Sequence, residues 1–177
     1  KSKIGPETTA LLFFSGFGIQ SARQSYMIPV DAQIWKEIDV RHDGVSIESV
    51  LGAMKERGAK VKLAVIDASR RNPYERRFRA YSHGLAPINA PDNALILSSA
   101  TPGQVVDEAG GQYSLLMAEL LKSLDTPNAG AEAVFSKTRV AVSRATEGEQ
   151  VPTVSSSLAQ DVPLKADAAL ASGKAGS

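Results

Sequence analysis

The sequence contains no cysteine and only two histidines among its 177 residues. Without cysteine the chain can form no disulfide and no thiolate metal site, and it has no cysteine nucleophile. Two histidines, His42 and His83, are too few for the usual zinc sites with nitrogen and sulfur ligands. The sequence therefore indicates no metal and no cofactor. A lack of cysteine is tolerated in both the cytoplasm and the periplasm, so the compartment stays unknown.

The sequence also lacks an excess of charge of one sign, and it lacks long apolar runs. The 20 basic residues are balanced by 19 acidic ones, which gives a formal net charge of +1. No global field therefore favours a nucleic acid or a membrane surface as partner. No apolar stretch reaches the roughly 18 residues that a transmembrane helix needs, so we expect a soluble protein. The length and the 43% hydrophobic content suit one ordinary domain with a sizeable core.

Three short apolar runs predict buried strands, at residues 9–15, 61–67 and 93–99. A helix is predicted from Ser46, a candidate N-cap, to Gly58, which can end a helix in the left-handed conformation. Apolar residues three and four apart predict further helices at 113–124 and 131–144, and segments 26–30 and 150–158 are expected to be extended. This order predicts the α/β class, with a mostly parallel sheet flanked by helices.

The carboxyl ends of the three predicted strands carry small and polar residues. Ser15-Gly16-Phe17-Gly18 follows the first strand, Asp67-Ala68-Ser69 ends the second, and Ser98-Ser99 ends the third. Ligands of parallel sheets bind beyond the carboxyl ends of the strands. The sequence therefore predicts a site where these three strand ends meet.

Several motifs in series resemble one family. The sequence reads SGFG, SYMIPVDA, VIDASRRNP, RRFRAYSHGLAP, ILSSATPG, GGQYS and VPTVSSSL, in that order. In order and spacing they resemble the caspase-like domain of the bacterial metacaspase and orthocaspase group, from about residue 9 to residue 164. The resemblance implies a caspase-like three-layer sandwich over residues 1–164, in a bacterial cytoplasm or periplasm. The small, polar residues 165–177 are expected to form a flexible tail.

The resemblance fails at the two catalytic positions. Members of the group carry Ser-Gly-His-Gly and Asp-Ala-Cys-Arg, and the positions that match the histidine and the cysteine are Phe17 and Ser69 here. A serine hydroxyl needs a nearby base, and phenylalanine has no exchangeable proton. Loss of a coupled nucleophile and base costs about 10⁴–10⁶ in rate. Backbone N–H groups at Gly18 and Ser69 could retain weak oxyanion stabilisation. We therefore expect a pseudo-caspase with a binding or regulatory role.

The resemblance also implies a substrate pocket. Ser15, Asp67 and Ser99 match positions that line the pocket for a basic residue in metacaspases, where a carboxylate faces a guanidinium or ammonium group. The expected partner is therefore a protein or peptide with a basic residue. In the alternative interpretation Asp67 caps a turn and both serines satisfy local backbone groups.

Other interpretations remain open at this stage. Ser69 could be the nucleophile of a serine hydrolase that recruits His42 or His83 as its base, or an engineered replacement for the cysteine of an endopeptidase. Isolated histidines in polar loops are, however, typical of solvated surface residues. Family members can need calcium, and Asp43, Asp107 and Glu108 could supply carboxylates, but their spacing matches no EF-hand loop.

A last departure concerns the N-terminal part of the family domain. In the family a strand and helices precede the first motif, and nothing in this sequence matches them. The sheet would then lack a strand. We therefore expect a separate N-terminal fragment or a second copy of the chain to cover the exposed sheet edge.

Overall fold

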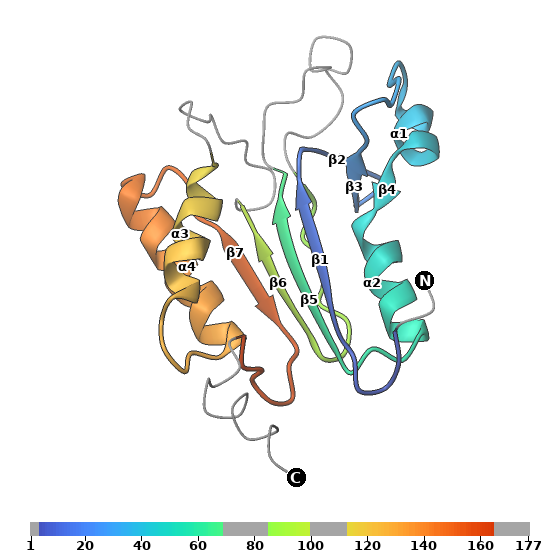
Figure 1. The fold of residues 1–177 in the computed structure, drawn as a ribbon. Coiled ribbons are helices and arrows are strands. Elements are labelled where there is room, and N and C mark those ends of the chain that lie inside the picture. The colour runs from blue at the N-terminus through green and yellow to red at the C-terminus, as the bar shows by residue number, and fades with distance from the viewer. Residues whose placement is uncertain (1–3, 69–84, 100–112, 165–177) are drawn as a thin grey trace.

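A computed structural model describes residues 4–68, 85–99 and 113–164 of the chain (Figure 1). Its main sheet has the order β1-β5-β6-β7. The strands β1 (Thr9–Ser15), β5 (Val61–Asp67) and β6 (Ala94–Ser98) run parallel, and β7 (Thr153–Ser156) runs antiparallel to β6. The three predicted buried strands are confirmed, the third of them one residue shorter at each end.

Helices cover both faces of this sheet, which gives three layers (Figure 1). The helix α2 (Ile47–Glu56) lies on one face, and α3 (Leu115–Leu124) and α4 (Ala131–Ala145) lie together on the other. Alternate residues of β5 point to opposite faces, so Leu63 and Val65 join the core under α3 and α4, whereas Ala64 and Ile66 join the core under α2. The continuous apolar run of β5 follows from burial on both faces, and the predicted α/β fold is confirmed.

The predicted helix boundaries are close to the observed ones. The hydroxyl of Ser46 accepts a hydrogen bond from the Ser49 N–H and so caps α2, and Gly58 follows the helix with φ of +79°. The expected extended segments are present with shifted bounds, since β7 occupies part of 150–158 and a strand at 24–28 replaces the one expected at 26–30. The predicted tail, residues 165–177, lies outside the described residues.

A second, smaller sheet was not predicted. It has the order β2-β3-β4 and comprises β2 (Phe17–Ser21), β3 (Gln24–Ile28) and β4 (Val45–Ser46), with the short helix α1 (Glu37–Asp43) beside it (Figure 1). Its core contains Ile19, Tyr26, Ile28, Ile34 and Val40. This sheet follows β1 directly, so it lies next to the carboxyl ends of the parallel strands (Figure 1).

No helix in the described parts of the chain is both long enough and apolar enough to cross a membrane.

Candidate functional site

Backbone contacts bring the ends of β1, β5 and β6 together. Ser15 is the register partner of Asp67, and the Gly16 N–H donates a 3.0 Å hydrogen bond to the Asp67 carbonyl. On the other side of β5, the Ser99 N–H donates to the Ile66 carbonyl at 2.9 Å. The hydroxyl of Ser99 also accepts a 3.2 Å hydrogen bond from the Ala68 N–H. The residues predicted to line a pocket therefore lie on neighbouring strand ends.

The side chain of Asp67 is buried, with 4% of the residue exposed. Its carboxylate accepts a 2.5 Å hydrogen bond from the hydroxyl of Ser114. The same hydroxyl oxygen accepts a hydrogen bond from the Met117 N–H at 3.2 Å and so caps α3. Asp67 is thus fixed to the first turn of a helix that covers the sheet.

Ser99 is buried, whereas Ser15 is exposed at the end of β1. The carbonyl of Ser99 accepts a 2.7 Å hydrogen bond from the side-chain amide of Gln150, which is itself buried. The N–H of Gln150 donates to the hydroxyl of Thr146 at 3.0 Å, just after α4. Both serines of the predicted pocket therefore reach the site, but only Ser15 faces solvent.

Sequence reasoning missed two residues of this site. Ser114 stands one position before an apolar helical run, a signal for an N-cap, but nothing in the sequence connects it to Asp67. Gln150 lies in a polar segment and carries no signal of burial.

Phe17, which the sequence resemblance predicts at the position of the family histidine, begins β2 and packs against the core of the small sheet. The next residue, Gly18, lies very close to the end of β5. A Cβ atom at Gly18 would lie 2.9 Å from the Ala68 Cβ and 2.5 Å from a Leu85 methyl carbon. Only glycine allows this approach. Gly18, the residue after Phe17, therefore lies against Ala68, the last described residue before Ser69. Ser69 itself, with its N–H, lies outside the described residues.

His42 lies in the last turn of α1 and its Nδ1 is 2.7 Å from an Asp43 carboxylate oxygen. This hydrogen bond raises the pKa of His42 above its ordinary value. The side chain of His42 is 85% exposed, as expected for a surface histidine. His83, Asp107 and Glu108 lie outside the described residues. Within the described ranges, no group of three or more His, Asp or Glu side chains is arranged to hold a metal ion.

A separate pocket of about 270 Å³ lies beside β6 and β7, on the face that α2 covers elsewhere. Its floor includes Ile96 and Ser98 of β6, and β7 and the segment 85–89 form its walls. Apolar side chains and hydroxyl groups both line it, a mixture typical of sites that take an apolar group and orient it by hydrogen bonds.

These features define an α/β three-layer domain with a buried carboxylate and hydroxyl groups at converging strand ends. The sequence model of the caspase domain matches residues 2–163, which is most of the chain. The chain belongs to the caspase domain family and is a homologue of its peptidases. A search of the curated proteins finds no match.

Proposed function

We propose that this caspase-family domain, of the metacaspase and orthocaspase group, is catalytically inactive and binds a protein or peptide segment that carries a basic residue. Phe17 is the observation that carries the proposal. It occupies the position of the family histidine, and its side chain packs against an apolar core. A phenyl ring cannot accept the proton of a nucleophile, so this position contributes packing in place of proton transfer.

Asp67 supports the choice of a basic ligand. Its carboxylate is buried, and the donor that the described part of the structure gives it is the neutral hydroxyl of Ser114. A buried carboxylate is stabilised further by a cation with matching geometry, and a guanidinium group can donate two parallel hydrogen bonds. A basic side chain that enters past the exposed Ser15 would supply this charge.

The pocket beside β6 and β7 supports a peptide as the ligand. Its volume of about 270 Å³ suits one apolar side chain better than a whole small molecule. Ser98 belongs both to this pocket and to β6, whose end forms the site. Because Asp67 points to the face that carries α3 and the pocket lies on the opposite face, a segment that places a basic residue near Asp67 and an apolar residue in the pocket would pass over the carboxyl ends of the strands.

Peptide turnover tests the absence of catalysis. The protein and its Ser69→Ala variant are incubated with a peptide pool rich in Arg and Lys sites. We expect the same background rate for both. A rate that disappears with Ser69→Ala, together with labelling of Ser69 by a fluorophosphonate, would show a serine hydrolase and overturn the proposal.

Peptide binding tests the ligand. A pool of fluorescent peptides with one Arg is compared with the same pool carrying Gln at that position, and retention by the protein is measured. We expect Arg-dependent retention that Asp67→Asn weakens at least tenfold. The matched control is Asp92→Asn, an exposed carboxylate paired with Lys55. Equal retention of the Arg and Gln pools would contradict the proposed ligand.

A further inference from the structure

On one face of the main sheet, apolar side chains give way to hydroxyl groups from one strand to the next. On β5 the face under α2 carries Ala64 and Ile66, which belong to the core there. On β6 this face carries Ile96 and then Ser98, whose register partner on β7 is Thr153. A sheet face that lies against other parts of a protein is usually apolar, so hydroxyl groups here indicate a role other than packing.

The pocket of about 270 Å³ lies against these hydroxyl groups. Ser98, Thr153 and Ser155 line it from the sheet, and Leu85 and Ile88 line it from the segment 85–89. The residues that line it in the described parts of the chain are all uncharged. The pocket therefore offers a neutral surface that combines hydroxyl groups of the sheet with apolar side chains of the segment.

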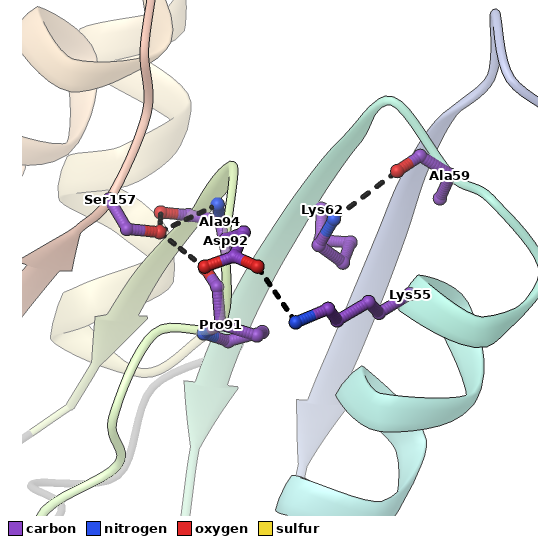
Figure 2. Close-up of polar contacts among 7 residues, drawn as sticks. All are labelled: Lys55, Ala59, Lys62, Pro91, Asp92, Ala94 and Ser157. Carbon is purple, nitrogen blue, oxygen red and sulfur yellow. Dashed lines mark hydrogen bonds and ion pairs between the residues drawn. The ribbon is translucent and has the colours of Figure 1, made fainter.

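The segment 85–89 is held in place by two buried or partly buried serines. The hydroxyl of Ser25, which is fully buried, donates a 3.3 Å hydrogen bond to the Ala86 carbonyl. Just after the segment, the hydroxyl of Ser157 donates to the Pro91 carbonyl and accepts a 3.0 Å hydrogen bond from the Ala94 N–H (Figure 2). The pocket is therefore formed in the free protein, and a ligand need not order this segment when it binds.

The hydroxyl of Ser98 has no hydrogen-bond partner among the described residues, although Ser98 is only 9% exposed. Every fully buried side-chain nitrogen or oxygen atom in the described part of the chain does have a partner. The Ser98 hydroxyl therefore is not fully enclosed but reaches the pocket that it lines. A ligand that covered this hydroxyl with apolar atoms alone would leave a buried polar group unpaired.

We propose that the pocket binds a tyrosine side chain, with the phenol hydroxyl hydrogen-bonded to Ser98. The inference rests on the proposed function, and it names the residue that the bound protein or peptide segment places in the pocket. A charged side chain would lose its hydration there without gaining an opposite charge. Leucine or phenylalanine would cover the Ser98 hydroxyl, and serine would be too small to cover Leu85 and Ile88. A tyrosine ring has an apolar body and a hydroxyl that usually finds a partner when buried.

N-acetyl-tyrosinamide, a single capped tyrosine, tests the pocket in the absence of any basic residue. In an NMR titration we expect it to shift the amide signals of residues that line the pocket. Its dissociation constant should be about fivefold lower than that of N-acetyl-phenylalaninamide, because one hydrogen bond is gained. Ser98→Ala should remove this difference. Ser136→Ala is the matched control, since Ser136 is exposed on α4 and does not line the pocket.

A second variant tests the pocket by filling it. Ser155→Phe adds a ring to a side chain that lines the pocket, so it should prevent binding of both compounds. Ser136→Phe adds the same ring to the exposed surface of α4 and should leave binding unchanged. Far-UV circular dichroism checks that each variant is folded. Folded Ser98→Ala and Ser155→Phe proteins that bind the tyrosine compound as the parent protein does would overturn the inference.

Peptides then separate this inference from the proposed function. A pool of Arg peptides that contain one Tyr is compared with the same pool carrying Phe, and with both pools carrying Gln in place of Arg. We expect the Arg and Tyr pool to be retained best, Ser98→Ala to lower its retention to that of the Phe pool, and Asp67→Asn to weaken both Arg pools. Arg-dependent retention without a preference for Tyr would overturn the inference and leave the proposed function standing. A preference for Tyr over Phe that is the same with Arg and with Gln would support the tyrosine pocket and contradict the basic ligand.

Discussion

The hydroxyl of Ser114 joins the carboxyl end of β5 to the start of α3. It donates to the buried Asp67 carboxylate at 2.5 Å and accepts from the Met117 N–H at 3.2 Å. One side chain therefore satisfies a buried charge and caps a helix. The position of Asp67 in the site and the position of α3 on the sheet depend on each other.

Ser114→Ala removes both interactions, so we expect it to lower the free energy of unfolding by about 2–3 kcal/mol. Ser46→Ala is the matched control, since Ser46 caps α2 through the Ser49 N–H and donates a 3.2 Å hydrogen bond to the carboxylate of Glu48, which is only partly buried. The loss of this cap and of a hydrogen bond to a partly exposed carboxylate is expected to cost about 1 kcal/mol. Urea denaturation of the three proteins measures the difference. Equal losses in the two variants would mean that Asp67 gains little from Ser114.

Gly18→Ala is expected to destabilise the protein by about 2 kcal/mol, because the new methyl group would overlap Leu85 and Ala68. Gly52→Ala is expected to stabilise the protein. Nothing lies within 4 Å of a Cβ at Gly52, and alanine favours the interior of α2 by about 0.5–1 kcal/mol. Thermal unfolding of both variants tests the close approach of β2 to β5. A Gly18→Ala variant as stable as the parent protein would contradict it.

The main sheet and its helices could be predicted from the sequence because the apolar patterns and the helix-capping residues agree there. In β5 the apolar run is continuous because both faces are covered, and in α2 the cap, the apolar spacing and Gly58 agree. The hairpin of β2 and β3 was missed because its turn residues, Ala22 and Arg23, carry none of the usual signals. Both adopt positive φ, 48° and 65°, where Asn and Gly are typical.

Part of the site could also be predicted, because that part depends on local features of the sequence. Strand ends are local features, so Ser15, Asp67 and Ser99 could be placed at one edge of the sheet from the sequence. Their partners come from distant segments. Ser114 is 47 residues from Asp67, and Gln150 is 51 residues from Ser99. Contacts over such separations depend on how the helices pack, and no single-sequence pattern encodes them.

The turn at Ala22 and Arg23 yields a prediction. A left-handed conformation costs a residue with a Cβ about 1–2 kcal/mol, and Asn and Gly tolerate it better. The double variant Ala22→Asn, Arg23→Gly should therefore raise the free energy of unfolding by about 1–2 kcal/mol. Arg23→Ala, which removes the charge but keeps the Cβ atom, should give no such gain. If both variants have the same urea midpoint, the turn is not strained.

Lys62 lies near the start of β5, at the opposite end of the sheet from the site, and is 3% exposed. Figure 2 shows its polar contact with Ala59. Its ammonium group donates a 3.2 Å hydrogen bond to the Ala59 carbonyl. Nearby, Lys55 and Asp92 form an exposed ion pair at 2.7 Å. Burial lowers the pKa of Lys62 from its ordinary value of 10.5; the Asp92 carboxylate opposes this shift, and the Lys55 charge adds to it.

The direction of this shift fixes a pH dependence. The unfolded chain holds the Lys62 proton up to a higher pH than the folded protein does. The free energy of unfolding therefore gains a contribution that rises with pH between the folded pKa of Lys62 and 10.5. Below that window the folded protein bears the full cost of a buried ammonium group. Urea midpoints measured from neutral pH to pH 10.5, relative to Lys62→Met, should rise with pH.

Lys60→Met is the control, because Lys60 is exposed by 60% and pairs with Glu7 on the surface. Its pH dependence should follow that of the parent protein, since the variant keeps Lys62. Lys62→Met should lose the rising contribution, because methionine has no proton to release. A parent protein and a Lys62→Met variant with parallel pH profiles would show that Lys62 titrates alike in both states. The ammonium group would then reach solvent in the folded protein, and burial would not govern its pKa.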